Sequence, residues 1–547
     1  MRSLVPRRGE AVYTQDFDPV AHSLGLTAVV AAVPILTLIV LLGAIRMRAQ
    51  WAAPIALVTA IAVATAIYGM PVDQAVLSAA EGATFALFPI MWVVVAAIWV
   101  YNMTVETGHF AVLRRSIGSV SADQRVQVVL IAFCFGTLME ALAGFGAPAA
   151  ITSVMMVALG FRPITAAACA VLGNTAAIPF GALGIPITTL SDVTGLDEGE
   201  LGAMVGRQTP LVGLIVPFVL VGMVDGRRGL RQAWPVAAVG GLAFAFAQFI
   251  CSNYISVEVT DIVASTSSIA AIVALLYVWT PVTPPVPEPA RRDDAARDSP
   301  VEVLRAYAPY LVILAVFSIA QLPAVERELA GSPWSTSFEW PGLDVRNPDG
   351  DPLRTLTFQV NWLPAAGTLM LISGLITIAV IGLTPARALR VAHDTLVRLR
   401  PAIVVVTAVL ALAYVVNQSG QTLTLGLWAA GAGSFYAFLA PVIGWLGVAV
   451  TGSDTSSNAL FGAVQVTAAD HTGIPETLLA ASNASGGVLG KMISAQHLAI
   501  AAAAVGIARH EGALFRRVVG WSIVLLLVVS ALVYLQSTPA LDWMVPG

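Results

Sequence analysis

Apolar segments of about twenty residues recur along the chain, and each is long enough to cross the hydrocarbon core of a membrane as a helix. Of the 547 residues, 57% are hydrophobic and only 11% are charged, whereas soluble proteins carry about 25% charged residues. A soluble protein of this length could not cover its surface with so few charges. The sequence therefore predicts an all-α, polytopic protein of the cell membrane, with roughly 12–16 transmembrane segments in the lipid bilayer. The clearest spans are 27–45, 51–69, 84–103, 205–224, 234–251, 262–280, 306–322, 363–384, 398–416 and 519–537.

Charge and motif content argue against several other classes of protein. The net charge is −4 and no basic stripe occurs, so no nucleic-acid partner is expected. The cysteines are odd in number and lack C-x-x-C spacing, which argues against a disulfide framework or a zinc site. The histidines form no ligand cluster, and neither G-x-S-x-G nor H-E-x-x-H is present. We therefore expect a protein that is not an enzyme and needs no cofactor or metal.

Arginine-rich loops alternate along the chain with loops that are acidic or poor in cations. Cytoplasmic loops of membrane proteins carry an excess of Arg and Lys, so the arginine-rich loops are predicted to face the cytoplasm. This assignment places both termini outside. The arginine-rich loops lie at 46–48, 114–125, 227–231, 291–305, 387–400 and 509–517, and the predicted external loops lie at 73–81, 192–200, 258–261 and 324–360.

Landmarks in the first half of the chain recur in the second half at a nearly constant separation. The loop charges give opposite directions to the spans that end at Gly108 and Gly420, so the repeat is predicted to be inverted. Paired broken helices in two inverted halves are typical of transporters that bind their substrate at the middle of the bilayer. The paired landmarks, separated by 308 to 312 residues, are Gly108 with Gly420, Gly144 with Gly452, and Asn174 with Asn483.

A proline-rich segment at 280–300 separates the two halves and is predicted to be a cytoplasmic linker. No apolar core occurs in the first 26 residues, so no cleavable signal peptide is expected. The predicted organisation is a polar segment at 1–26, a first inverted repeat at 27–232, connecting helices with the linker at 233–305, a second inverted repeat at 306–537 with an external loop at 324–360, and a C-terminal tail at 538–547.

Two regions, 126–200 and 424–508, contain apolar runs that are interrupted by Gly, Pro, Asn and isolated charges. In the first, Gly144, Phe145 and Gly146 precede Pro148, a pattern that predicts a short break followed by a new helix. An unwound break at membrane depth is tolerated only where it is buried or lines a cavity. The new N-terminus would offer unpaired N–H groups and a positive dipole end to a carboxylate. This pattern predicts one half of an anion site.

The second region supplies a matching set of polar residues. Ser453, Asp454 and Thr455 precede an apolar run and can cap a new helix, with Asn458 one turn on. Asn amides in the next broken spans can hydrogen-bond across helices, although close packing explains them equally well. The predicted substrate-binding residues are Gly144, Phe145, Gly146, Asn174, Thr175, Arg207, Ser453, Asp454, Thr455, Asn458, Asn483 and Lys491.

Four ionisable residues lie within the broken spans: Glu140, Arg207, Asp454 and Lys491. An ionisable side chain inside a membrane costs a few kcal/mol, so each is a functional candidate. Burial favours the neutral form of a carboxyl group, so Glu140, together with Asp454, is predicted to couple transport to protons. The alternative for Glu140 is permanent pairing with Arg207 or Lys491. Both cations are candidate partners for a substrate carboxylate, and Arg207 could instead reach the external interface.

These motifs resemble those of the L-lactate permease family, which belongs to a broader group of ion transporters with inverted repeats. The likeness is strongest over 85–210 and 395–510. It implies proton symport of L-lactate, with D-lactate and glycolate as related substrates, by alternating access around a midplane site. The matching runs are 144–148, 160–163, 174–176, 180–186, 205–208, 445–447, 490–494, and Thr-Gly-Ser-Asp-Thr-Ser-Ser-Asn-Ala-Leu-Phe at 451–461.

Two other functions stay open at the level of the residues. A sodium-coupled carboxylate or dicarboxylate carrier would use similar parts, because unwound carbonyls and Ser, Thr and Asn side chains also bind Na⁺. A passive carboxylate channel could share the same glycine-rich breaks. The sequence leaves the oligomeric state open, a homo-oligomer included.

Overall fold

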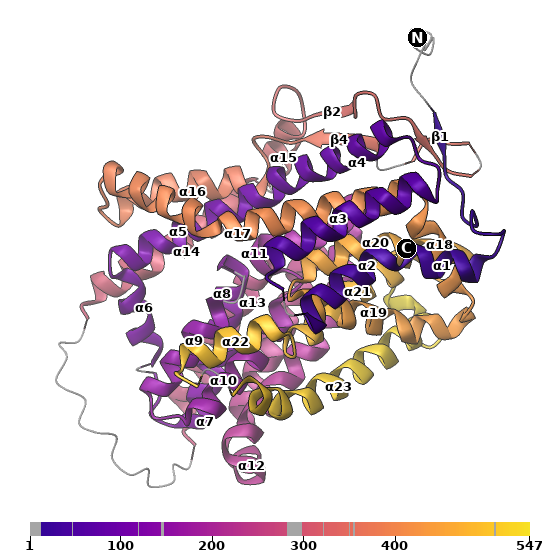
Figure 1. Ribbon diagram of the computed structural model, residues 1–547. Helices are drawn as coiled ribbons and strands as arrows, with labels where there is room; N and C mark the ends of the chain where they lie inside the picture. The colour runs from indigo at the N-terminus through magenta and orange to yellow at the C-terminus, as the bar shows by residue number, and fades with distance from the viewer. Residues whose placement is uncertain are drawn as a thin grey trace.

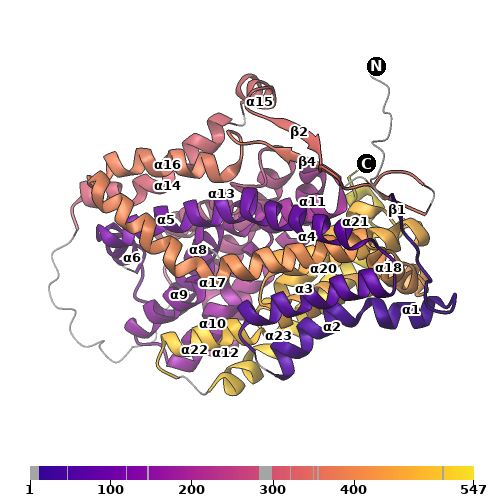
Figure 2. The same ribbon diagram turned by 45° about the horizontal axis from the view of Figure 1, so that its top comes forward.

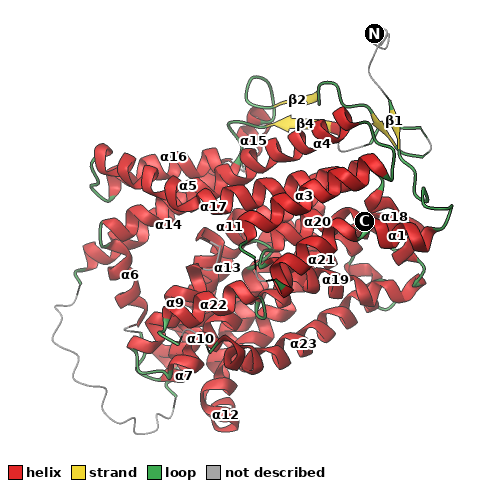
Figure 3. Ribbon diagram, in the orientation of Figure 1, coloured by secondary structure: helices red, strands yellow, loops and turns green. Residues whose placement is uncertain are grey.

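The computed structural model describes residues 12–45, 47–118, 120–143, 147–281, 298–320, 322–348, 350–353, 356–507 and 510–546. Helices dominate these residues, and strands form only two short two-stranded pairs (Figure 3). The predicted all-α class is therefore confirmed. Gly144, Phe145 and Gly146 of the predicted break, and most of the predicted linker, lie outside the described residues.

Most helices in the N-terminal part of the chain are strongly apolar, as expected for segments that face lipid or other helices. The elements are β1 Tyr13–Thr14, α1 Leu24–Ala31, α2 Val33–Ile39, η1 Val40–Ala44, α3 Ala49–Ala66, α4 Val72–Phe85, η2 Ala86–Met91, α5 Trp92–Glu106 and α6 His109–Gly118.

The next part contains the first set of broken helices, followed by the long helix α12. The elements are α7 Gln124–Val128, η3 Val129–Phe135, α8 Gly136–Ala143, α9 Ala147–Ala158, α10 Pro163–Gly173, η4 Thr175–Ala177, α11 Gly181–Thr194, α12 Glu198–Tyr254, α13 Thr260–Val278, α14 Pro300–Ala320 and α15 Pro323–Leu329.

The C-terminal part begins with the predicted external loop and ends with a long apolar helix. The elements are β2 Thr336–Glu339, β3 Val345–Arg346, β4 Thr357–Val360, α16 Ala366–Val380, α17 Pro385–Gln418, α18 Gln421–Ala430, η6 Gly433–Phe435, α19 Tyr436–Thr451, α20 Asp454–Thr472, α21 Glu476–Lys491, α22 Ala495–Ala504, α23 Glu511–Gln536 and η7 Asp542–Met544.

Ten of the described helices are long and apolar enough to cross a membrane, and eleven if the bent pair 163–177 and 181–194 counts as one span. All the spans predicted from sequence fall on helices. Two further spans, 124–142 and 433–451, lie within the regions that the sequence left unclear. Helix α16, at 15 residues, is shorter than its predicted span.

Long helices of the two halves pack together in one layer. Helix α17 packs against α3, α4 and α5, and α16 packs against α5 and α14. These helices run side by side across the upper part of Figure 1, and Figure 2, turned so that the top comes forward, shows the same layer with the β2–β4 strand pair beside it. The broken helices α8 to α11 and α20 to α22 lie below this layer, beside α12, α13 and α23. The inverted relation between the halves stays a prediction.

Helix α12 is a hairpin of two arms rather than one straight rod. Its backbone leaves helical geometry at Asp225 and at Gly226, where φ is +58°. The two arms then run back along each other so closely that a Cβ at Gly206 would lie 1.8 Å from the hydroxyl of Ser252. The two predicted spans 205–224 and 234–251 are these two arms.

Small residues allow α19 and α21 to pack with their backbones almost in contact. A Cβ atom at Gly444 would lie 2.0 Å from the carbonyl oxygen of Asn483, and one at Gly486 would lie 2.0 Å from that of Pro441. Close approach through small residues is a common way for membrane helices to associate. This packing fixes the position of Asn483 and of Lys491 at the end of α21.

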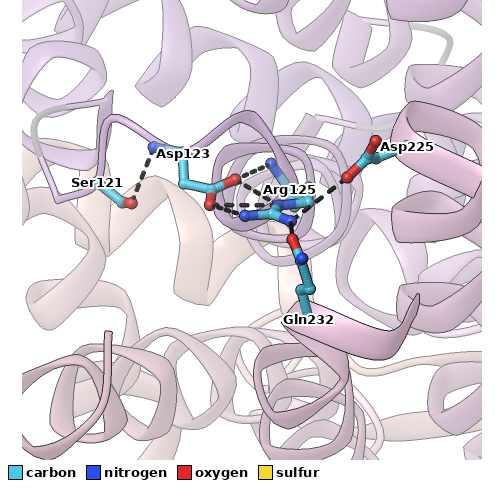
Figure 4. Close-up of polar contacts among 5 residues, drawn as sticks. All are labelled: Ser121, Asp123, Arg125, Asp225 and Gln232. Atoms are coloured by element: carbon cyan, nitrogen blue, oxygen red, sulfur yellow. Dashed lines mark hydrogen bonds and ion pairs between the residues drawn. The ribbon is translucent and has the colours of Figure 1, made fainter. Parts of the chain in front are cut away.

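A buried arginine joins the start of α7 to the turn of the α12 hairpin (Figure 4). Arg125 is only 2% exposed. Its guanidinium donates to Asp123 Oδ2 at 2.6 Å, to Gln232 Oε1 at 2.6 Å and to Asp225 Oδ2 at 3.3 Å. The sequence predicted Arg125 to be one of several cations in a basic loop, and its burial depends on tertiary contacts that the sequence does not reveal.

The Arg125→Met variant is expected to be less stable than the unmodified protein by about 3–5 kcal/mol, because Asp123 would remain buried without its cation. Thermal unfolding in detergent would measure the loss. Arg387→Met is the matched control, since its ion pair with Glu106 is about half exposed on both sides and exposed pairs contribute only about 0–1 kcal/mol. Equal effects of the two variants would contradict the assigned role of Arg125.

Candidate functional site

Broken helices from the two halves of the chain meet in the middle of the molecule (Figure 1). Helix α11 packs against both α8 and α20, and α22 packs against α9. Helix α20 begins at a capped N-terminus, where the Ser453 hydroxyl accepts a hydrogen bond of 3.2 Å from the backbone of Ser456. The chain therefore forms several short helices, and the helix ends that carry the polar residues lie close together.

A buried ion pair lies at this meeting point. Lys491 Nζ, at the end of α21, lies 2.5 Å from Glu140 Oε1 on α8. Glu140 Oε2 accepts a hydrogen bond of 2.7 Å from the side-chain amide of Asn174, at the end of α10. Glu140 is 2% exposed and Lys491 is 7% exposed. Three side chains that the sequence singled out separately are thus in direct contact.

Asp454 is a second carboxyl group close to this pair. It lies within electrostatic range of both Lys491 and Glu140, and it is 3% exposed. Neither of its side-chain oxygens has a hydrogen-bond partner in the described part of the chain. Gly487 faces it so closely that a Cβ there would lie 2.1 Å from Asp454 Oδ1. Lys491 is therefore paired with Glu140, and Asp454 is a second buried acid nearby that forms no ion pair in the described residues.

A chain of amides holds three of the broken helices together. Asn483 Nδ2 donates to Asn458 Oδ1 at 2.8 Å, and Asn458 Nδ2 donates to the carbonyl of Pro186 in α11 at 3.0 Å. Gln465 Nε2 donates to Asn483 Oδ1 at 3.3 Å. Asn458, Asn483 and Gln465 are all fully buried. These contacts fix α11, α20 and α21 in one arrangement.

Three other predicted site residues form no hydrogen bond or ion pair with Glu140 or Lys491 in the described part of the chain. The Thr175 hydroxyl donates to the carbonyl of Leu172 at 2.7 Å, and Thr455 is half-buried in the first turn of α20. Arg207 donates to Asn253 Oδ1 at 2.9 Å and to the carbonyl of Met544 at 2.7 Å. The Arg207 guanidinium therefore binds the C-terminal tail and not the carboxyl group of Glu140.

A cavity of about 400 Å³ reaches the break at the start of α11. Ala182 and Leu183 have positive φ values of 46° and 62° there, which is unusual for residues with a side chain. Leu183 lines the cavity, as do the carboxyl groups of Asp192 and Glu198. The loop charges predict that this side of the protein is external.

Sequence reasoning missed two polar residues near the site. Asp261 was assigned to an external loop, yet it is fully buried, and Gln248 Nε2 donates to its Oδ1 at 2.9 Å. Asp261 lies at the start of a long apolar helix, and an acid there has the same pattern as an ordinary loop residue. The sequence therefore carries little indication that Asp261 is buried, because acids are common at helix N-termini that face water.

Comparisons with known proteins identify the family of this chain. A family model described as L-lactate permease matches residues 27–538. Glycolate permease GlcA of Escherichia coli K12 is 39% identical over 549 residues, covering 96% of this chain and 98% of that protein. L-lactate permease of Salmonella typhimurium is 38% identical over 556 residues, covering 98% and 100%. A solved structure of Neisseria gonorrhoeae MtrF is 13% identical with a TM-score of 0.45, covering 83% of this chain and 82% of that one. With its apolar helices, this chain is a multi-pass protein of the cell membrane that belongs to the L-lactate permease family.

Proposed function

We propose that this protein is a secondary active transporter that imports L-lactate, with D-lactate and glycolate as related substrates, by proton symport. The observation that carries the proposal is the buried ion pair between Glu140 and Lys491 where the broken helices meet. Relatives named L-lactate permease and glycolate permease support the substrate class. Both substrates have one carboxylate and a hydroxyl group on the adjacent carbon.

Lys491 is proposed to bind the substrate carboxylate, because an ammonium group forms strong charge-assisted hydrogen bonds with carboxylates. A carboxylate that binds Lys491 must displace Glu140, whose oxygen now lies 2.5 Å from the ammonium nitrogen. An ionised Glu140 left buried without a cation would be costly. Glu140 therefore binds a proton when the substrate binds, and this exchange couples the two.

Substrate release is proposed to follow from the same competition between Glu140 and the substrate carboxylate for Lys491, in the reverse direction. When the site opens to the side with fewer protons, Glu140 loses its proton and pairs with Lys491 again. The ion pair then displaces the substrate carboxylate. Alternating access of this kind is proposed to come from movement of the two halves, 27–232 and 306–537. Both landmark glycines, Gly108 and Gly420, have positive φ values, of 77° and 90°, which is consistent with related halves.

Asp454 and the amide chain are proposed to orient the substrate. The Asp454 oxygens lack hydrogen-bond partners in the described residues, so they are available to a substrate hydroxyl. Asp454 also competes with Glu140 for the one cation and is proposed to take part in proton coupling. Asn174, Asn458 and Asn483 would hold the helices around the site. The break at 144–146 stays a proposed part of the site.

Uptake by proteoliposomes tests the proposed function. An inward proton gradient is expected to drive uphill accumulation of labelled lactate and glycolate, whereas an inward sodium gradient alone is expected to drive none. Pyruvate and succinate complete the panel, and succinate is expected to be taken up poorly because a second carboxylate has no second cation to bind. Accumulation driven by sodium would support a sodium-coupled carrier. Equilibration without accumulation would support a channel.

A further inference from the structure

Asp261 is a buried acid that the exchange at Lys491 does not use. It lies in the first turn of α13 and is fully buried. Its Oδ1 atom accepts the hydrogen bond from Gln248, and its Oδ2 atom has no hydrogen-bond partner in the described part of the chain. Burial of a carboxyl group with one oxygen unsatisfied costs free energy, so packing alone does not explain it.

Gln248 connects Asp261 to the broken helix that carries Asn174. The Gln248 Nε2 atom also donates to the carbonyl oxygen of Ala176 in η4 at 3.0 Å. Its Oε1 atom accepts from the Thr209 hydroxyl at 3.3 Å. Asn174, two residues before Ala176, donates to Glu140. Asp261 is therefore held beside the same break that positions Glu140.

In the described part of the chain, Asp261 forms no ion pair with a cation. Helix α13 packs against α8, α12 and η3. Glu140 of α8 and Cys251 of α12 interact electrostatically with Asp261, and Cys134 of η3 contacts Ser268 of α13 further along. Lys491 is paired with Glu140. Asp261 is therefore a second buried carboxyl group near Glu140, held by Gln248 and without a cation of its own in the described residues.

We propose that Asp261 is a further proton-binding residue of the transport site and that its proton crosses the membrane with the substrate. The inference rests on the proposed function, since it assumes that the site is alternately open to each side. Asp261 would bind a proton as a carboxyl O–H on the outer side and release it as H⁺ on the inner side. The carrier would then move one more proton per substrate than it does without Asp261.

The number of protons coupled to each substrate tests this proposal. In proteoliposomes without a membrane potential, the logarithm of the steady-state lactate ratio rises linearly with the imposed pH difference, and the slope is the number of coupled protons. The Asp261→Asn variant keeps an acceptor for Gln248 but cannot carry a proton. We expect its slope to fall by about one, which is a tenfold lower lactate ratio per pH unit. An unchanged slope would overturn the proposal.

Lactate exchange at equal pH separates this role from a structural one. Asp261→Asn should still exchange lactate, because Glu140 and Lys491 are unaltered. If it does not, Asp261→Glu decides: restored exchange with the original slope supports an acid function, and failure of both variants assigns Asp261 to packing and overturns the proposal. Asp394→Asn, an exposed acid on α17, is the control and should leave the slope unchanged. A zero slope in the unmodified protein would instead reject symport itself, and this inference with it.

Discussion

The Glu140→Gln variant is expected to accumulate at least tenfold less lactate per unit of imposed pH difference, because it loses the proton that Glu140 carries, while it still exchanges lactate across the membrane. Glutamine keeps the size of the side chain and can still accept a hydrogen bond from Asn174, but it cannot bind or release a proton. Lys491 would then be free to hold the substrate carboxylate on both sides of the membrane. The measurement is labelled lactate uptake into proteoliposomes, first with an imposed pH gradient and then in exchange with unlabelled lactate at equal pH.

A second buried glutamate provides a matched control for this variant. Glu81 is 1% exposed and accepts a hydrogen bond of 2.7 Å from the Gln418 amide, much as Glu140 accepts from Asn174. In the described residues, Glu81 has no lysine or arginine partner within ion-pair distance. Glu81→Gln should retain accumulation driven by the pH gradient, because Glu81 lies on α4 and, in the described residues, forms no hydrogen bond or ion pair with the broken helices that hold Glu140. Accumulation by Glu140→Gln with the same pH dependence as the unmodified protein would refute the proposed coupling role.

The residues that could be predicted from sequence are those whose chemistry conflicts with an apolar span. Glu140 and Lys491 are the clearest examples, because a charge within a stretch of apolar residues costs too much to be kept without a use. Asn174 and Asn483 are polar residues at matching positions of the two halves, so they were also detectable. The structure brings the first three of these into contact, although the sequence could not specify which cation pairs with Glu140.

The remaining features depend on contacts between distant parts of the chain. Arg207 has the same local pattern as a substrate-binding cation, but the carbonyl of Met544, 337 residues away, occupies its guanidinium. Asp261 and Arg125 lie near the ends of spans, where charged residues normally face water, so their burial follows only from tertiary packing. Leu183 has a left-handed backbone conformation, which a leucine in the sequence does not indicate.

The Lys491→Gln variant is expected to raise the half-saturation constant for lactate about tenfold to a hundredfold, since a hydrogen bond to a charged group contributes about 1.5–3 kcal/mol. The amide can still donate one hydrogen bond to the substrate carboxylate, but it cannot neutralise its charge. Glu140 would lose its cation partner, so the proton that it carries should no longer be coupled to lactate, and accumulation per unit of pH difference should also fall. Initial rates of uptake at several lactate concentrations, in proteoliposomes with a fixed amount of protein, measure the first effect.

The Arg207→Gln variant tests which of two cations binds the substrate carboxylate, since the sequence alone did not distinguish Arg207 from Lys491. Its guanidinium binds Asn253 and the C-terminal tail, so removal of its charge should leave the half-saturation constant within about twofold while lowering thermal stability. A large increase for Arg207→Gln with none for Lys491→Gln would show that the substrate carboxylate binds elsewhere. The increase expected for Lys491→Gln alone follows from one geometric fact: of the two cations, only Lys491 lies against a buried carboxylate that a substrate carboxylate can replace.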